Sequence, residues 1–426
     1  MTFCTSYYIA YCGYKSKFAT IRLHLVDFKV TIVIISLERK SSMKTTNNSD
    51  WAIESARATL FKELHIAEFW MPQITGVNNC NLKCKHCYVY ENGRPKANIL
   101  SPEAYVEVLR SLMTSVKPFS DKWDIVFPGM EPLLPRNAAY IRPMAVEAAR
   151  LGARSIGITT NGTLMHGETL EWLVSSPVST VNVSLDGSQR HHDWIRGNGT
   201  YAITTANARK FCNIKGKKKA ITNTTVMETN SMMLSEISRI SRDIGCDYAA
   251  FHPFETAVNA DNALDTQTNG ITLGFKTLIQ EFLEGHTGSV VIEFEAGTAG
   301  CFFRLLETGI LDGFKIMEDE TQFRFLRKLV GKNECLINLI FYPHHFVRTV
   351  RVLDNGSLSS CRMIAKHGWC GVGNLINQSI KEISRLPETI LAAADIWDEY
   401  RRSLSSIQTE TIERYLTLDT RLKGGD

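Results

Sequence analysis

The feature that most constrains the fold is a repeated alternation between short apolar or β-branched runs and longer segments with helical periodicity. The strand-like runs cover residues 69–77, 123–127, 155–159, 180–185, 221–228 and 247–251. Helical periodicity covers residues 102–116, 137–151, 168–175, 201–214 and 232–244. Six strand-then-helix units predict an α/β fold with a parallel sheet, open or curled into part of a barrel. Ligands of such sheets bind beyond the carboxyl ends of the strands.

Composition excludes several classes of protein. The chain has 426 residues, of which 44% are hydrophobic and 22% charged, as expected for a globular protein of two or three domains. A formal net charge of +4 is too small an excess to indicate a nucleic-acid-binding protein. The longest apolar run, residues 31–37, falls well short of the roughly 20 residues that span a bilayer. We therefore predict neither nucleic-acid nor membrane binding.

Eleven cysteines are the most informative part of the composition. No signal peptide precedes them, so we expect a cytoplasmic protein in a reducing compartment. Closely spaced cysteines in such a protein are metal ligands or catalytic groups more often than disulfides.

The first 42 residues differ in composition from the rest and contain two isolated cysteines. Two interpretations stay open for this segment. Met43 is the natural start and the segment is not native, or the segment is a small hairpin or an unstructured extension.

Cys80, Cys84 and Cys87 lie within eight residues, directly after the first predicted strand. Three thiolates cannot close a structural zinc site, which needs four ligands. Four cysteines saturate a cubane iron–sulfur cluster, so three would leave one iron open to a small molecule. The alternative is a zinc loop completed by His86 or by a distant residue, although adjacent His86 and Cys87 could hardly serve one tetrahedral ion.

The C-x3-C-x2-C spacing resembles the cluster loop of the radical S-adenosylmethionine (SAM) enzymes. Gly129-Met130-Glu131-Pro at the end of the second strand resembles the Gly-Gly-Glu-Pro segment that holds the SAM amino group in that family. Met130 replaces the second glycine of the motif. Thr-Asn-Gly at residues 160–162, after the third strand, is also typical of the family. The resemblance covers about residues 69–255.

The same resemblance implies roles for residues near the next strand ends. Ser184 would contact the ribose or methionine part of SAM, and Arg196 would pair with its carboxylate. His86 would lie by the adenine, and His252 follows the last strand, where the family's barrel often closes over the adenine.

The C-terminal part resembles the SPASM and twitch domains, which carry auxiliary clusters in one branch of the family. Gly356 and Cys361 have the Gly-x4-Cys spacing of their small hairpin. Four ligands are expected for one further [4Fe-4S] cluster: Cys301, Cys335, Cys361 and Cys370. The sequence around Cys301 also suits a buried helix. Cys212 and Cys246 are interpreted as core residues.

The resemblance predicts a partial (β/α)6 TIM-like barrel with a C-terminal SPASM/twitch-like auxiliary iron–sulfur domain. The expected domains are an N-terminal extension, the radical SAM barrel, the auxiliary-cluster region and a helical tail, at residues 1–68, 69–290, 291–385 and 386–426.

The implied activity is that of a radical SAM oxidoreductase. A [4Fe-4S] cluster bound by three cysteines and SAM would cleave SAM reductively to a 5′-deoxyadenosyl radical, which abstracts hydrogen from the substrate. We expect a ribosomally made precursor peptide as substrate, with the enzyme acting as a maturase that forms a crosslink or similar modification in natural-product biosynthesis. The electron donor would be of the flavodoxin or ferredoxin type. Alternatives are a dehydrogenase of a sugar or aminocyclitol that uses the auxiliary cluster as electron acceptor, and a cluster-bearing sensor that never cleaves SAM. No catalytic acid or base is identified.

Overall fold

The computed structural model describes the central part of the chain. Its described residues are 68–70, 80–87, 100–116, 123–128, 130–254, 269–295, 298–318, 324–339, 349–352, 358–359, 373 and 377–378. All of them belong to the unit Asp50–Asp426. The proposed N-terminal extension up to residue 67, the helical tail, Gly129, Cys361 and Cys370 lie outside the described residues.

Seven strands follow one another along the chain and across the sheet. They are β1 (Glu68–Trp70), β2 (Asp124–Phe127), β3 (Ser155–Thr160), β4 (Thr180–Ser184), β5 (Lys219–Val226), β6 (Tyr248–Pro253) and β7 (Val290–Phe294). Each pairs with the next in parallel. This order confirms the predicted α/β fold with a parallel sheet.

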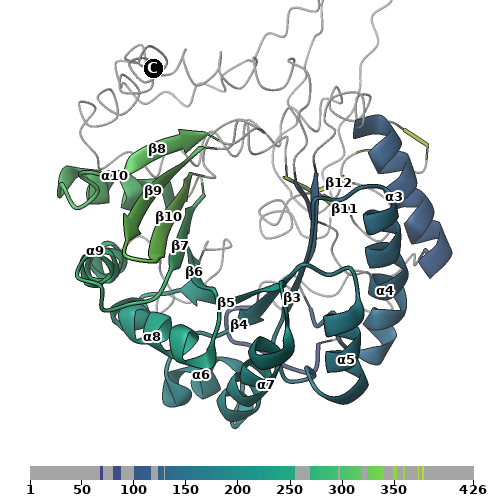
Figure 1. Cartoon of the computed structure of the whole chain (residues 1–426), viewed down its shortest axis with the longest axis horizontal. Helices are drawn as coiled ribbons and strands as arrows, with labels where there is room; N and C mark the ends of the chain where they lie inside the picture. Colours follow the sequence, from purple (N-terminus) through teal and green to yellow (C-terminus); the bar gives the residue numbers. More distant parts are fainter. Residues whose placement is uncertain are drawn as a thin grey trace, which may run out of the picture. The chain divides into compact units, whose positions relative to one another are not determined.

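Helices cover the outer face of the curved sheet, as Figure 1 shows. They are α3 (Pro102–Val116), α4 (Pro135–Arg150), α5 (Gly167–Ser175), α6 (Gln189–Arg196), α7 (Thr200–Ile214), α8 (Leu234–Ile244), α9 (Asn269–Leu283) and α10 (Ala299–Glu307), with a short 3-10 turn, η1 (Ser231–Met233), before α8. The helices α3, α4, α5, α7 and α8 lie close to predicted helices, and α10 agrees with the buried helix that the sequence around Cys301 suits. The sequence of α6 is short and mostly polar, so it gave no periodicity long enough to predict a helix.

The sheet continues beyond the six predicted units at both edges. On one side β10 (Asn333–Leu339) runs parallel to β7, and β9 (Arg324–Val330) and β8 (Lys315–Glu318) follow in antiparallel order. On the other side β11 (Thr349–Val352) runs parallel to β1 and pairs antiparallel with β12 (Leu358–Ser359). β11 and β12 therefore pair as the predicted hairpin around Gly356 requires.

One face of each strand packs against the helices, and the other face lines the concave side. In β7 the buried residues are Val290, Ile292 and Phe294, and the Phe294 ring lies 5.3 Å from that of Phe275 in α9. Burial of each such side chain contributes about 1.5–3 kcal/mol. Because side chains alternate along a strand, Val291 and Glu293 face the concave side. The same alternation places His252 of β6 there, between the buried Phe251 and Pro253.

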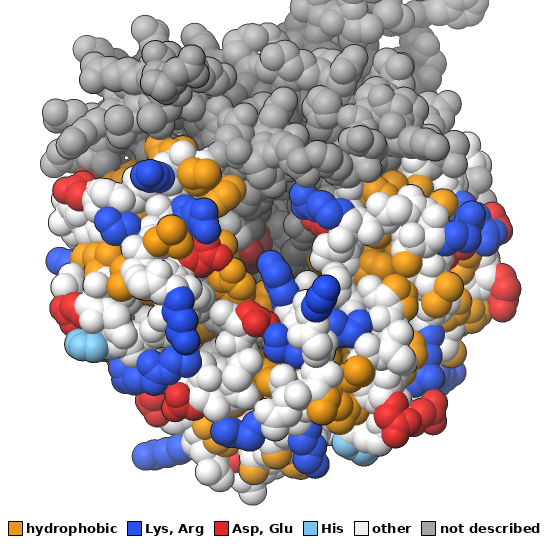
Figure 2. Space-filling view, viewed as in Figure 1, with side chains coloured by type: hydrophobic (Ala, Val, Ile, Leu, Met, Phe, Trp, Pro, Cys, Tyr) orange, Lys and Arg blue, Asp and Glu red, His pale blue; other side chains and the backbone are white. Residues whose placement is uncertain are grey.

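The surface mixes apolar and charged side chains. Figure 2 shows one face, on which hydrophobic side chains lie among charged ones and Lys and Arg gather near the middle. Within the ranges described above, no helix combines the length and apolar character needed to cross a bilayer.

Candidate functional site

The loop that carries Cys80, Cys84 and Cys87 is attached to α6. The Lys85 amide donates to the Ile195 carbonyl at 3.0 Å, and the Cys87 amide donates to the Cys84 carbonyl at 3.1 Å. The Lys85 ammonium lies 3.8 Å from the centre of the Trp194 ring, a cation–π contact. These contacts hold the loop beside α6, which follows the carboxyl end of β4.

Hydrogen-bond donors face the sulfur atoms of Cys80 and Cys84. The Cys80 sulfur is 3.4 Å from the Leu82 amide and 3.8 Å from the Asn161 side-chain nitrogen. The Cys84 sulfur is 3.9 Å from Arg196 Nη1. Burial raises the pKa of Cys80 to about 12 and that of Cys84 to about 11. The free thiols therefore stay protonated at neutral pH, whereas a bound metal holds them as thiolates.

The donor set fits an iron–sulfur cluster. The fit rests on three half-buried thiols in one short loop, with donors already aimed at two of the sulfurs. Among the described side chains, no three His, Cys, Asp or Glu residues converge closely enough to hold a metal ion. Four irons with bridging sulfides occupy more space than one ion, so thiols that bind a cluster need not converge on one point.

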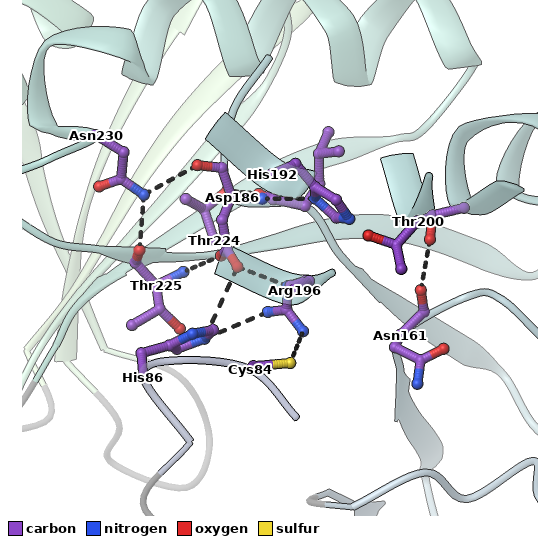
Figure 3. A network of polar contacts seen from close by, with 12 residues as sticks. Cys84, His86, Asn161, Asp186, His192, Arg196, Thr200, Thr224, Thr225 and Asn230 are labelled. Atoms are coloured by element: carbon purple, nitrogen blue, oxygen red, sulfur yellow. Dashed lines mark hydrogen bonds and ion pairs between the residues drawn. The ribbon is translucent and has the colours of Figure 1, made fainter. Parts of the chain in front are cut away.

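Asp186, which follows β4, is the centre of a buried network around the loop (Figure 3). Its Oδ2 atom accepts from Arg196 Nε at 2.6 Å and lies 3.7 Å from His86 Nε2. Burial alone would raise the pKa of Asp186, but the charge of Arg196 outweighs it and holds this pKa below its usual range. Asp186 is therefore ionised and fixes the Arg196 guanidinium beside Cys84.

Further hydrogen bonds hold Asp186 in place. The Thr225 amide donates to Asp186 Oδ1 at 3.1 Å, and the Asn230 side chain donates to the Asp186 carbonyl at 3.0 Å. The Asp186 amide donates to His192 Nδ1 at 3.3 Å. The carboxylate is thus held by β5 and α6 before any ligand binds.

His86 presents a buried nitrogen that lacks a partner. Burial lowers the pKa of His86 to about 4, so the ring is neutral at pH 7. Its Nε2 atom lies 3.5 Å from Arg196 Nη2 and accepts from that donor, which assigns the proton to Nδ1. Nδ1 is buried with no hydrogen-bond partner in the described structure. An unpaired buried donor costs stability unless a ligand supplies an acceptor.

Glu131 joins the ends of β2 and β3. Its side chain is fully buried, and it accepts from the Thr160 hydroxyl at 2.6 Å, the Asn161 amide at 2.8 Å and the Leu133 amide at 3.1 Å. Burial raises the pKa of Glu131 to about 7, although these three donors favour the ionised form. Glu131 thereby shapes the backbone at the strand ends.

Met130 occupies the position of the motif's second glycine in a conformation that glycine favours. Its φ angle is +49°, in the left-handed region where a side chain costs about 1–2 kcal/mol. Among the described non-glycine residues it alone has a positive φ. At this position the backbone therefore has the conformation that a glycine would adopt. Ser184, the last residue of β4, is buried.

The structure adds residues to which sequence analysis gave no role. The Asn161 side chain donates to Asn81 Oδ1 at 2.9 Å, and Asn81 donates to Thr163 Oγ1 at 2.8 Å. These bonds tie the end of β3 to the cysteine loop. Asp186, the hub of the network, was given no role either. The position of Asp186 directly after a strand, ten residues before Arg196, was the available signal.

Polar side chains continue along the concave face of the sheet. His252 Nε2 lies 3.1 Å from Thr225 Oγ1, whose amide contacts Asp186. In the next strands, Glu293 of β7 is opposite Asn338 of β10, which donates to Glu293 Oε1 at 3.1 Å. Burial raises the pKa of Glu293. A polar row thus leads from the Asp186 network to Glu293.

The structure places Cys301 and Cys335 apart. Cys335 is opposite Val290, at the amino end of β7, and is buried in the core between sheet and helices. Cys301 is buried in the first turn of α10, which follows the other end of β7. From Val290 to Phe294 is roughly 13 Å along a strand. The two thiols are not brought together in this arrangement, and the auxiliary ligand set stays a prediction.

A protein-family model matches part of the chain. The model described as "Radical SAM superfamily" matches residues 74–237, which include the cysteine loop, Glu131, Ser184 and Arg196.

Two curated relatives come from Methanosarcina barkeri. An Fe-coproporphyrin III synthase is 36% identical over 122 residues, which is 28% of this chain and 27% of that protein. An AdoMet-dependent heme synthase is 28% identical over 183 residues, or 41% of this chain and 47% of that protein. The chain thus covers less than half the length of either relative.

Among solved structures, SuiB of Streptococcus suis is similar in fold. SuiB bound to the precursor peptide SuiA gives a TM-score of 0.54 at 14% identity, covering 86% of this chain and 75% of SuiB. SuiB bound to S-adenosylmethionine gives a TM-score of 0.56. At this identity the likeness concerns the fold alone.

Proposed function

We propose, from the premise that this chain carries a radical SAM domain at residues 74–237, that it modifies a ribosomally made precursor peptide. A [4Fe-4S] cluster with bound SAM supplies the reductive cleavage that gives a 5′-deoxyadenosyl radical. The chain's own residues bind and orient the cluster, SAM and the substrate. Cys80, Cys84 and Cys87 would hold the cluster, and its open iron would take SAM.

Arg196 is suited to hold the SAM carboxylate. Its Nε atom is occupied by Asp186, whereas Nη1 and Nη2 face Cys84 and His86 on the side of the cysteine loop. A guanidinium fixed at one nitrogen presents the other two to a carboxylate with little loss of rotamer entropy. His86 Nδ1 would donate to the adenine.

The polar row on the concave face is the observation that carries the peptide proposal. By the alternation along the strands, this face carries three asparagines, Asn182, Asn223 and Asn338. It also carries His252 and Glu293. Side-chain amides donate and accept, and therefore pair well with peptide N–H and C=O groups. The carboxyl-terminal halves of the described strands β3 to β7 and β10 place no Lys or Arg on this face. Such a wall suits peptide groups better than a ligand with several carboxylates. The fold likeness to a protein bound to its precursor peptide supports the same proposal.

Two parts of the proposal concern electron transfer to and from the active site. A flavodoxin- or ferredoxin-type donor would reduce the cluster at the cysteine loop. A second [4Fe-4S] cluster would accept an electron from the substrate radical, with Cys361 and Cys370 as its candidate ligands, because Cys301 and Cys335 are not brought together. Iron and sulfide per chain, measured on the wild type and on a Cys361→Ala, Cys370→Ala variant, test that ligand set.

Transfer of deuterium tests the peptide proposal. A peptide encoded by a short open reading frame beside the gene is prepared with perdeuterated residues and incubated anaerobically with the reconstituted enzyme, SAM and dithionite. Deuterium in 5′-deoxyadenosine, with a mass change in the peptide, is the expected result. SAM cleavage without deuterium transfer from any such peptide would contradict the peptide substrate and leave the radical SAM activity intact.

A second candidate substrate is a tetrapyrrole. The curated relatives named above are an Fe-coproporphyrin III synthase and a heme synthase. The lengths matched, 122 and 183 residues, are close to that of the radical SAM domain, whose machinery is shared among many substrates. A Soret-band shift on titration of the enzyme with coproporphyrin would favour this candidate. An unchanged porphyrin spectrum is the result that the peptide proposal expects.

A further inference from the structure

The amino-terminal end of the sheet, opposite the cysteine loop, contains a cavity of about 720 Å³. Lys219, Tyr248 and Asn333, the first residues of β5, β6 and β10, line it. So does Cys246, directly after the glycine that ends α8. The strands separate this cavity from the Asp186 network, so it does not belong to the radical site.

Cys246 faces a second thiol. Its sulfur lies 3.8 Å from that of Cys212 in the last turn of α7. Both cysteines are half-buried and reduced. The Cys246 amide donates to the Ser241 carbonyl at 3.1 Å, and the α8 cap at Gly245 fixes the backbone next to it. A substituted Cβ at Gly245 would come within 3.3 Å of Cys212 Cβ, so the two segments already touch. The sulfurs would move from 3.8 Å to about 2.05 Å apart on forming a disulfide bond.

The cavity is basic. Its cations are Lys215, Lys217, Lys218, Lys219, Arg242 and Lys332, against the carboxylates of Asp247 and Glu334. Lys215 is paired with Asp247 at 2.8 Å, and Arg327 donates to Glu334 at 2.8 Å. Lys217 and Lys332 are exposed and have no ion-pair partner among the described residues. A ligand with carboxylates would therefore be attracted to the cavity.

The two sulfurs differ in acidity. The thiol of Cys246 donates to Cys212 and lowers the pKa of Cys212, with help from the charges of Lys215 and Arg209. The pKa of Cys246 is raised by the same contact. Cys246 lines the cavity and Cys212 does not, so an entering reagent meets Cys246 first, and Cys212, 3.8 Å behind it, is placed to attack second.

We propose that Cys212 and Cys246 form a reversible disulfide by exchange with an anionic low-molecular-weight disulfide that enters this cavity. Cys246, which lines the cavity, loses its proton, attacks one sulfur of R–S–S–R, forms a mixed disulfide and displaces RS⁻. The Cys212 thiolate then attacks the Cys246 sulfur, which forms the Cys212–Cys246 bond and releases the second RS⁻. The two protein thiols lose two electrons and two protons, and the disulfide reagent takes them up as two RSH.

Two reagents of similar size and opposite charge test the site. Reconstituted enzyme is incubated anaerobically with 3,3′-dithiodipropionate or with cystamine, alkylated, digested and analysed by mass spectrometry. We expect a Cys212–Cys246 crosslinked peptide that dithiothreitol reverses, formed at least about tenfold faster with the anionic reagent. The Lys217→Glu, Lys332→Glu double variant should lower the ratio of the crosslinking rate with the anionic reagent to the rate with cystamine.

Single variants separate exchange from simple oxidation. Cys212→Ser should accumulate a mixed disulfide on Cys246, because no second thiol displaces the adduct, whereas Cys246→Ser should react slowly. Cys4→Ser, at one of the two isolated cysteines of the first 42 residues, is the matched control and should crosslink like the wild type. Equal rates with both reagents, a faster reaction with cystamine, or alkylation of both cysteines without a crosslink would each overturn the proposal. None of these readouts depends on SAM cleavage or on the substrate.

Discussion

Ion pairs at the two ends of the parallel sheet differ in how far they are exposed to water. At the carboxyl end, Asp186 and Arg196 form an ion pair with no more than 10% of either side chain exposed. At the amino end, Arg154 pairs with Asp124 with 42% and 18% of the side chains exposed. Water can stabilise the second pair but not the first. A buried ion pair with a neighbouring unpaired donor, His86 Nδ1, is costly in the free protein and is explained by a ligand that completes it.

The comparison predicts that substitutions at the carboxyl end affect both stability and chemistry, whereas those at the amino end affect stability alone. The following substitutions test this difference.

Replacing Arg196 by Leu should have the largest effect. Asp186 would lose its charged partner while buried, which costs about 3–5 kcal/mol. We also expect SAM cleavage to fall by about a hundredfold or more, because SAM would be misplaced. Arg154→Leu at the other end is the control, and its cost should stay below about 1 kcal/mol with unchanged cleavage. Urea unfolding measures the change in stability, and methionine release measures the change in SAM cleavage. Equal losses in the two variants would contradict the comparison.

Replacing Glu131 by Gln should come next. Three donors face this carboxylate, and an amide NH₂ would oppose at least one of them, at a cost of about 1–3 kcal/mol. The SAM dissociation constant should rise as the strand ends shift. Glu168→Gln, at an 84% exposed side chain, is the control. If Glu131→Gln unfolded at the same urea concentration as that control, the three hydrogen bonds to Glu131 would contribute little to the free energy of unfolding.

Glu147 of α4 should matter for stability only, and in a pH-dependent way. Arg150 and Arg110 lower the pKa of Glu147 to about 2, below its value in the unfolded chain. The carboxylate therefore stabilises the fold at pH values above about 4.5, and this stabilisation is lost as the pH falls toward 2. Both arginines are substantially exposed, so Glu147→Gln should cost about 1 kcal/mol at pH 7. The difference from wild type should shrink below pH 4.5 with SAM cleavage unchanged at pH 7. If the stability difference between wild type and Glu147→Gln grew as the pH fell, the lowered pKa of Glu147 would be contradicted.

Met130→Gly should have the smallest effect. Glycine relieves the strain of the left-handed backbone but adds entropy to the unfolded chain, so the net change should lie within about 1 kcal/mol of zero. Met130→Ala keeps the strain and is the matched control. Thermal unfolding should give a midpoint for the Gly variant at or above that of the Ala variant. The reverse order would mean that the φ angle carries no strain.

Local signals made the barrel and the cysteine loop predictable. The i, i+3 spacing of Leu234 and Ile237 predicted α8, and both residues are buried. Non-local pairings were not predictable in this way. β10 follows β9 by a tight turn yet pairs in parallel with β7, and β11 returns to β1 across most of the sequence. Such registers depend on the packing of distant segments.

Motif spacing predicted that Arg196 and the cysteine loop belong to the site. The structure places Arg196 beside Cys84 and His86. Spacing could not show that Asp186 is the hub, because its role depends on donors from β5 and α6. Glu293 was missed for a related reason. A lone carboxylate in an apolar strand is informative only when the facing strand, here with Asn338, is known.

Formation of methionine and 5′-deoxyadenosine tests most directly that the carboxyl end is a radical SAM site. Reconstituted wild type and a Cys80→Ala, Cys84→Ala, Cys87→Ala variant are incubated anaerobically with SAM and dithionite, and iron per chain is measured on the same samples. We expect both products from the wild type and neither from the variant, which should lose about four irons per chain. Unchanged product formation or full iron retention in the variant would contradict the assignment of the cluster to this loop.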